Sequence, residues 1–205
     1  MTRKLVIAAL FVAGALMATA ATFTQCPPVG ADALGCQLLI TVTAIDGAGA
    51  ATAFTVAQST TDTGPFDNSE DTLIGITNSA SGTLTSVFLD GGAGSAAFGF
   101  DGDGACTGSY SPGPTAAQCG GAFTFTDPAD YGSAGASFGT VCASKDCGTV
   151  LVNLANGKST WFDLEGTIQA SQITSGTPEP GSVVLLGSGL AAFLGLAWRR
   201  RRAQQ

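Results

Sequence analysis

Short runs with the pattern of β-strands recur along this chain, and glycine, proline, aspartate or asparagine closes each run. The clearest is residues 36–45, CQLLITVTAI, in which every second side chain from Cys36 to Ala44 is apolar. Such alternation predicts a half-buried strand, and a single sheet of such strands would leave an apolar face in water. We therefore predict an all-β fold of two packed sheets, a β-sandwich. The predicted strands are 36–45, 50–58, 71–77, 82–89, 95–100, 122–126, 148–155 and 159–170.

In the last of these runs, side chains on opposite faces of the strand differ in character. Phe162 faces one way, whereas Trp161, Asp163 and Glu165 face the other. The alternation places Trp161 on the polar face, where its flat ring could stack on a sugar, although a partly buried edge position is the commoner outcome for such a tryptophan. Asp163 and Glu165 resemble a pair of glycosidase acids, but an open outer face offers no cleft that would separate their pKa values.

The N-terminal residues 1–20 have the features of a secretory signal peptide. Arg3 and Lys4 precede an uncharged run from Leu5 to Met17, and the small residues of Ala18-Thr19-Ala20 follow it. This order predicts export and cleavage close to residue 21.

The C-terminal residues 177–205 combine three signals. The apolar run 182–198 would form a helix of roughly 25 Å, close to the thickness of a hydrocarbon core, and predicts one transmembrane helix. Before it stand two prolines that favour an extended backbone, the conformation that proteases bind. After it stands a basic cluster that keeps its end in the cytoplasm, so the rest of the protein faces outward. The residues concerned are Pro178, Glu179 and Pro180, and the membrane stop of Arg199, Arg200, Arg201 and Arg202.

This order of Pro-Glu-Pro, apolar span and arginine cluster resembles the PEP-CTERM sorting signal of Gram-negative bacteria that make exopolysaccharide. The resemblance implies that an exosortase, a membrane-embedded processing enzyme, cuts the chain near Pro178–Pro180 after a stage in the inner membrane. An ordinary single-pass anchor is the alternative. The pieces TGPFDNSEDTLIGITN, FGFDGDG and STWFDLEG also resemble the ectodomains of a recurring group of PEP-CTERM cargo proteins, which implies an extracellular β-domain without a known reaction.

Between the two targeting segments, residues 21–176 are long enough for one domain with its own core. Residues 21–178 contain two basic residues, Lys145 and Lys158, and fourteen acidic ones, so their formal charge is 2 − 14 = −12. Such a surface repels nucleic acid, which we exclude as a partner.

The exported part holds an even number of cysteines, and we expect disulfides because its compartment is oxidising. Several pairings are possible, among them the sequential one, which joins neighbours along the chain. A zinc site is disfavoured because the chain has no histidine. The cysteines are Cys26, Cys36, Cys106, Cys119, Cys142 and Cys147.

Asp101-Gly-Asp103-Gly is the most site-like motif, because alternating carboxylates on a glycine-rich turn can bind one calcium ion. The EF-hand pattern is absent, and a plain tight turn is the alternative. A second acidic stretch could share a cation with this turn if the fold brings both to one edge, although a solvated loop is the alternative. Its residues are Asp62, Asp67, Asn68, Glu70 and Asp71.

We expect no enzymatic activity, since the chain has no histidine, no G-x-S-x-G nucleophile motif and no phosphate-binding loop. The function we predict is that of a structural protein of the cell envelope or exopolysaccharide matrix, with an exosortase and envelope glycans or exopolysaccharide as partners. The alternative is a calcium-dependent carbohydrate-binding module of the cell surface that uses Asp101, Asp103 and Trp161. Calcium would be its only cofactor.

Overall fold

The computed structural model describes residues 22–30 and 33–174. The predicted signal peptide, Pro178–Pro180, the predicted span 182–198 and the arginine cluster lie outside these residues. Within the described part, no helix has the length and apolar character to cross a membrane. The strands are β1 (Leu38–Ile45), β2 (Ala51–Gln58), β3 (Thr72–Asn78), β4 (Leu84–Asp90), β5 (Ala136–Val141), β6 (Cys147–Leu154) and β7 (Ser159–Leu164). Two single-turn 3₁₀ helices are η1 (Ala105–Thr107) and η2 (Ala129–Tyr131).

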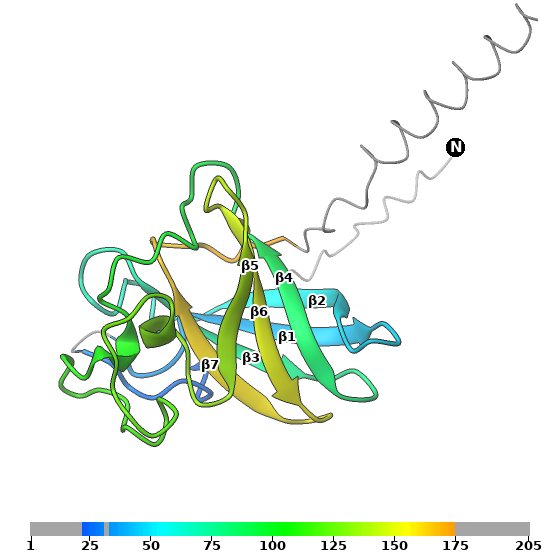
Figure 1. Ribbon diagram of the computed structural model, residues 1–205, viewed down its shortest axis with the longest axis horizontal. Helices are drawn as coiled ribbons and strands as arrows, with labels where there is room; N and C mark the ends of the chain where they lie inside the picture. Colours follow the sequence, from blue (N-terminus) through cyan, green and yellow to red (C-terminus); the bar gives the residue numbers. More distant parts are fainter. Residues whose placement is uncertain (1–21, 31–32, 175–205) are drawn as a thin grey trace, which may run out of the picture.

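The strands form two sheets, as the sequence predicted. One has the order β2-β1-β3-β7 and the other β4-β6-β5, and they pack face to face in Figure 1. All neighbouring strands are antiparallel except β1 and β3, which run parallel. The main core lies between the sheets, and the alternation read in residues 36–45 positions β1 correctly, because Leu38, Ile40 and Val42 point into it.

The four-stranded sheet is covered on its outer face as well, along β3 and β7. Ile74 and Ile76 of β3 belong to the main core, whereas Leu73 belongs to a second apolar cluster on the other face. This second cluster includes Phe66 and Trp161, together with residues from the N-terminal segment and the loop after residue 101. Strand β3 is therefore buried on both faces, which period-2 alternation alone does not predict.

Two predicted strands are wrong, and one real strand was missed. Residues 95–100 form a turn, because Ala96 and Phe100 have positive φ angles of 49° and 31°. Residues 122–126 form a loop in which Phe123 and Phe125 are 45% and 71% exposed, so their alternation does not mark a buried face. Strand β5, with the sequence ASFGTV, has a weak pattern of its own and forms through pairing with β6. The last predicted run ends early, since β7 stops at Leu164.

All six cysteines pair sequentially, so that possibility among the predicted pairings is confirmed. The disulfides are Cys26–Cys36, Cys106–Cys119 and Cys142–Cys147. The first two pack in or against the second apolar cluster and hold the loops that cover the outer face of β3 and β7. The third closes the turn between β5 and β6, where the Cys142 N–H also donates to the Cys147 carbonyl at 2.8 Å.

Candidate metal centre

Pairing of β3 with β7 gathers acidic side chains on the outer face of the four-stranded sheet. Leu73 pairs with Asp163 and Thr72 with Leu164, and the same register continued by one more residue sets Asp71 opposite Glu165. Because side chains alternate, these three acids share the face that the loops cover. Asp71 and Asp163 are 0% exposed and Glu165 is 8% exposed.

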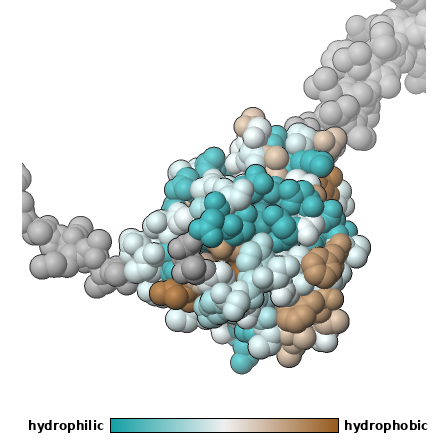
Figure 2. Space-filling view, turned by 90° about the vertical axis from the view of Figure 1, so that its left-hand side faces the viewer, coloured by the Kyte–Doolittle hydropathy of each residue, from teal (hydrophilic) through white to brown (hydrophobic). Residues whose placement is uncertain are grey.

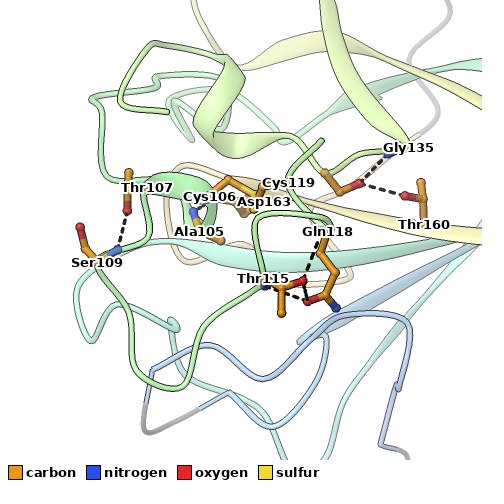
Figure 3. The surroundings of a disulfide bond; sticks show 11 residues. Ala105, Cys106, Thr107, Ser109, Thr115, Gln118, Cys119, Gly135, Thr160 and Asp163 are labelled. Atoms are coloured by element: carbon orange, nitrogen blue, oxygen red, sulfur yellow. Dashed lines mark hydrogen bonds between the residues drawn. A yellow bond between two sulfur atoms is a disulfide. The ribbon is translucent and has the colours of Figure 1, made fainter. Parts of the chain in front are cut away.

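This burial corrects two expectations about β7. Trp161 is only 5% exposed and lies in the second apolar cluster, so its predicted position on an exposed polar face is wrong. Its ring offers no open face on which a sugar could stack. Asp163 and Glu165 are also not on an open outer face, because the loop containing η1 covers them. Figure 3 shows Asp163 beneath this loop, next to Ala105 and the Cys106–Cys119 disulfide.

The fold brings the two acidic stretches of the sequence to one edge of the sheet. Carboxylate oxygens of Asp67, Asp71 and Asp103 lie within 4.8 Å of one another. A second group with the same spacing combines Glu70, Asp101 and Glu165.

Two residues of the predicted second acidic stretch, Asp62 and Asn68, belong to neither of these groups of carboxylates. Asp62 is buried elsewhere, where its carboxylate accepts hydrogen bonds from the Leu34 N–H at 2.7 Å and the Thr61 hydroxyl at 2.9 Å. Asn68 is exposed and adopts a left-handed backbone conformation with φ of 66°. The turn that contains it allows Asp67 to accept N–H groups, and neither Asp62 nor Asn68 is among the candidate ligands.

Tyr131 contacts three of these carboxylates, and the sequence analysis did not predict it as part of this acidic cluster. Its hydroxyl lies 2.8 Å from Asp103 Oδ1, 2.8 Å from Glu165 Oε2 and 3.2 Å from Asp101 Oδ1. A phenol has one proton to donate, so it cannot serve three carboxylates at once. The remaining carboxylate oxygens therefore face each other without a hydrogen between them, unless a proton or a cation is bound.

Several buried carboxylate oxygens in this region have no hydrogen-bond partner. They are both side-chain oxygens of Asp71, both of Asp130, and Asp163 Oδ1. Burial of a charged group without a partner is strongly unfavourable. The described residues offer only two basic side chains, Lys145 and Lys158, and both are exposed and form no salt bridge with these acids.

The burial of these carboxyl groups also shifts their pKa values. Burial, followed by the nearby Asp163 and Asp103, raises the pKa of Asp71 to about 10. Burial raises the pKa of Glu165 to about 7, although the Tyr131 hydrogen bond opposes the rise. The pKa values of Asp163 and Asp130 are raised by burial too. Without a bound cation, the cluster thus keeps protons at neutral pH that exposed carboxyls would lose.

Backbone and side-chain hydrogen bonds hold the candidate ligands in place. Asp67 Oδ1 accepts the N–H groups of the next turn, from residues 69, 70 and 71, at 2.9 to 3.1 Å. The Tyr110 hydroxyl donates to the Asp103 carbonyl at 2.6 Å. The Ala105 N–H donates to Asp163 Oδ2 at 3.0 Å. These contacts hold Asp67, Asp103 and Asp163 in place separately.

The described part of the chain is thus an all-β, two-sheet protein cross-linked by disulfides, the kind of fold that suits an oxidising compartment. A family model, the PEP-CTERM protein-sorting motif, matches residues 177–202. The chain therefore carries this sorting signal, as the order of its C-terminal residues indicated, and the signal implies exosortase-dependent sorting to the cell surface. Neither a curated protein nor a solved structure matches the chain.

Proposed function

We propose that the protein is a non-catalytic structural component of the cell envelope or exopolysaccharide matrix. The observation that carries this proposal is the attachment of a surface-sorting signal to a cross-linked two-sheet domain. In the proposed sequence of events, the span 182–198 holds the exported protein in the inner membrane until an exosortase cuts near Pro178–Pro180. The domain then enters the layer of envelope glycans or exopolysaccharide.

The character of the domain supports this role. Two disulfides hold the loops that cover β3 and β7, and the third closes the turn between β5 and β6, which suits a protein that must persist outside the cell. The face in Figure 2 shows a broad hydrophilic area with separate apolar patches. The outward residues of β2, such as Ala53 and Thr55, are small and uncharged. Such a surface can lie against neutral polysaccharide chains by hydrogen bonding without a deep binding site.

The buried acids favour a structural role over a hydrolytic one. A glycosidase needs two carboxyls that reach the substrate, whereas Asp163 is fully buried and Ala105 covers one of its oxygens. The carbohydrate-binding alternative loses its aromatic platform with the burial of Trp161. Its calcium component does not depend on that residue and is supported by the acidic cluster.

A genetic experiment in the native host tests the proposal. We expect a strain without the protein to form a weaker matrix, measured as the shear stress that disperses the cell layer, and the wild-type gene to restore it. A variant with Glu179→Ala in the sorting motif should not restore it and should leave the protein in the inner-membrane fraction at its uncut mass. The Gln172→Ala variant, which alters an exposed residue before the motif, should behave as wild type. Equal matrix strength with and without the protein would refute the structural role.

A further inference from the structure

We propose that Asp67, Asp71 and Asp103 form a structural calcium site that joins the loop before β3 to the loop before η1. The three side chains provide carboxylate oxygens within 4.8 Å of one another. This separation fits ligands around one ion, because calcium–oxygen distances of about 2.4 Å allow opposite ligands to lie about 4.8 Å apart. The inference concerns the purified protein alone and does not depend on the proposed function.

Asp71 is the independent observation that points to a ligand. It is 0% exposed, and neither of its side-chain oxygens has a hydrogen-bond partner. The other two members of its group, Asp67 and Asp103, are acidic as well. In a folded protein, buried polar atoms nearly always have partners. The unpartnered carboxylate faces two other carboxylates, so a bound cation is the partner that its surroundings favour.

No other group in the described structure compensates this charge. Lys145 and Lys158 are exposed and make no salt bridge there. The Tyr131 hydroxyl supplies a single proton, which is shared by oxygens of Asp101, Asp103 and Glu165 and does not reach Asp71.

The chemistry of the site favours calcium over other divalent ions. The ligands are oxygen atoms only, and every cysteine in the described residues is in a disulfide, so the soft ligands that zinc prefers are missing. Magnesium keeps several waters and is seldom enclosed by protein carboxylates, whereas calcium accepts six to eight oxygens in a flexible geometry. The Asp103 backbone is held by Tyr110 and the Asp67 carboxylate by its turn, so two ligands are already in position.

The second group is not part of the proposal. Glu70 and Asp101 are exposed, and Glu165 has the Tyr131 hydroxyl as a partner at 2.8 Å. Exposed acidic groups do not require an ion to be stable.

The test uses the full chain, exported so that its disulfides form, stripped of metal with EGTA and titrated with calcium chloride in a calorimeter. We expect saturable binding and a rise in the melting temperature with calcium concentration, because the ion binds the folded state. Asp71→Asn should weaken calcium binding by about tenfold or more, since one ligand charge is lost. Asp46→Asn removes the same charge from an exposed turn between β1 and β2 and should leave the affinity unchanged.

The metal-free proteins provide the decisive comparison. In EGTA, Asp71→Asn should melt at or above the temperature of wild type, because the amide has the shape of the carboxyl and needs neither a proton nor a cation to be neutral there, yet calcium should add little further stability. If Asp71→Asn does not fold, Asp67→Asn takes its place, since its amide oxygen can still accept the three turn N–H groups. The proposal would be overturned if wild type did not bind calcium, or if the substitution left the calcium affinity unchanged. It would also be overturned if wild type bound magnesium as tightly as calcium.

Discussion

At the residue scale, the cluster depends on close backbone contacts as much as on carboxylates. Gly104 separates Asp103 from η1, and a Cβ at this position would lie 2.6 Å from the carbonyl carbon of Asp130 and 2.8 Å from the Tyr131 nitrogen. Neither backbone atom can move without shifting η2. A glycine here allows the Asp103 turn to pack directly on the helix that carries Tyr131.

We expect Gly104→Ala to destabilise the protein by about 1–3 kcal/mol, the usual cost of overpacking a tight contact. Urea unfolding followed by circular dichroism measures the change. Gly47→Ala is the control, because a Cβ at Gly47 meets no atom within 4 Å. Equal stabilities for both variants would show that the contact at Gly104 is unimportant.

Trp161 gives a second prediction at this scale, which tests its burial. Trp161→Ala should lower the free energy of unfolding by about 3–5 kcal/mol, because it leaves a cavity in the second apolar cluster. Phe125→Ala removes a ring that is 71% exposed and should change stability by no more than about 0.5 kcal/mol. A small loss of stability for Trp161→Ala would contradict the burial of Trp161 and would favour the exposed position that the strand pattern indicated.

At the element scale, the second layer over β3 and β7 has little regular structure and relies on disulfides. Cys106–Cys119 spans 13 residues in the loop that covers Asp163, whereas Cys142–Cys147 spans only 5 and closes a turn between paired strands. A disulfide restricts the unfolded chain more when it closes a longer loop.

Replacing Cys106 and Cys119 together by serine should therefore destabilise the protein by about 2–3 kcal/mol. The same change at Cys142 and Cys147 should cost about 1 kcal/mol less, from the logarithmic dependence on loop length. Chemical denaturation of both double variants gives the comparison. The order would be contradicted if loss of the short disulfide proved more damaging than loss of the long one.

At the scale of the whole molecule, the acids concentrated on one side link stability to pH. The folded state raises the pKa of Asp71 from 3.8 to about 10 and that of Glu165 from 4.5 to about 7, so it binds more protons than the unfolded chain between these values. The free energy of unfolding falls with pH wherever the folded state binds more protons. The stabilising effect of these protons is complete below about pH 4 and is lost as pH rises through the folded-state values.

We therefore expect the metal-free protein to melt at a lower temperature at pH 8 than at pH 5. Glu165→Gln should reduce this difference, because it removes one of the groups that lose a proton as the pH rises to about 7. Differential scanning calorimetry in EGTA measures both effects. Stability that rises from pH 5 to pH 8 in EGTA would contradict the protonated state of the cluster.

Much of the architecture was accessible from residue patterns, because the relevant signals are local. Six of the seven strands overlap predicted runs, and Leu38, Ile40 and Val42 face the core as their alternation indicates. Strand β5 was not accessible in this way, since its pattern is weak and its partner β6 stabilises it. Residues 122–126 have a strong pattern but lack a neighbouring strand, so they remain a loop.

The sorting signal, the all-β domain and the even set of cysteines could be predicted from the residues, because motifs, alternation and composition are read along the chain. How the acids combine follows from the three-dimensional fold. Asp71 and Asp163 are separated by about ninety residues and meet through the register of β3 with β7, while Asp103 reaches them from a loop held by a disulfide. Strand pairing and loop cover depend on contacts between distant segments, and these contacts turned scattered acidic residues into one buried cluster.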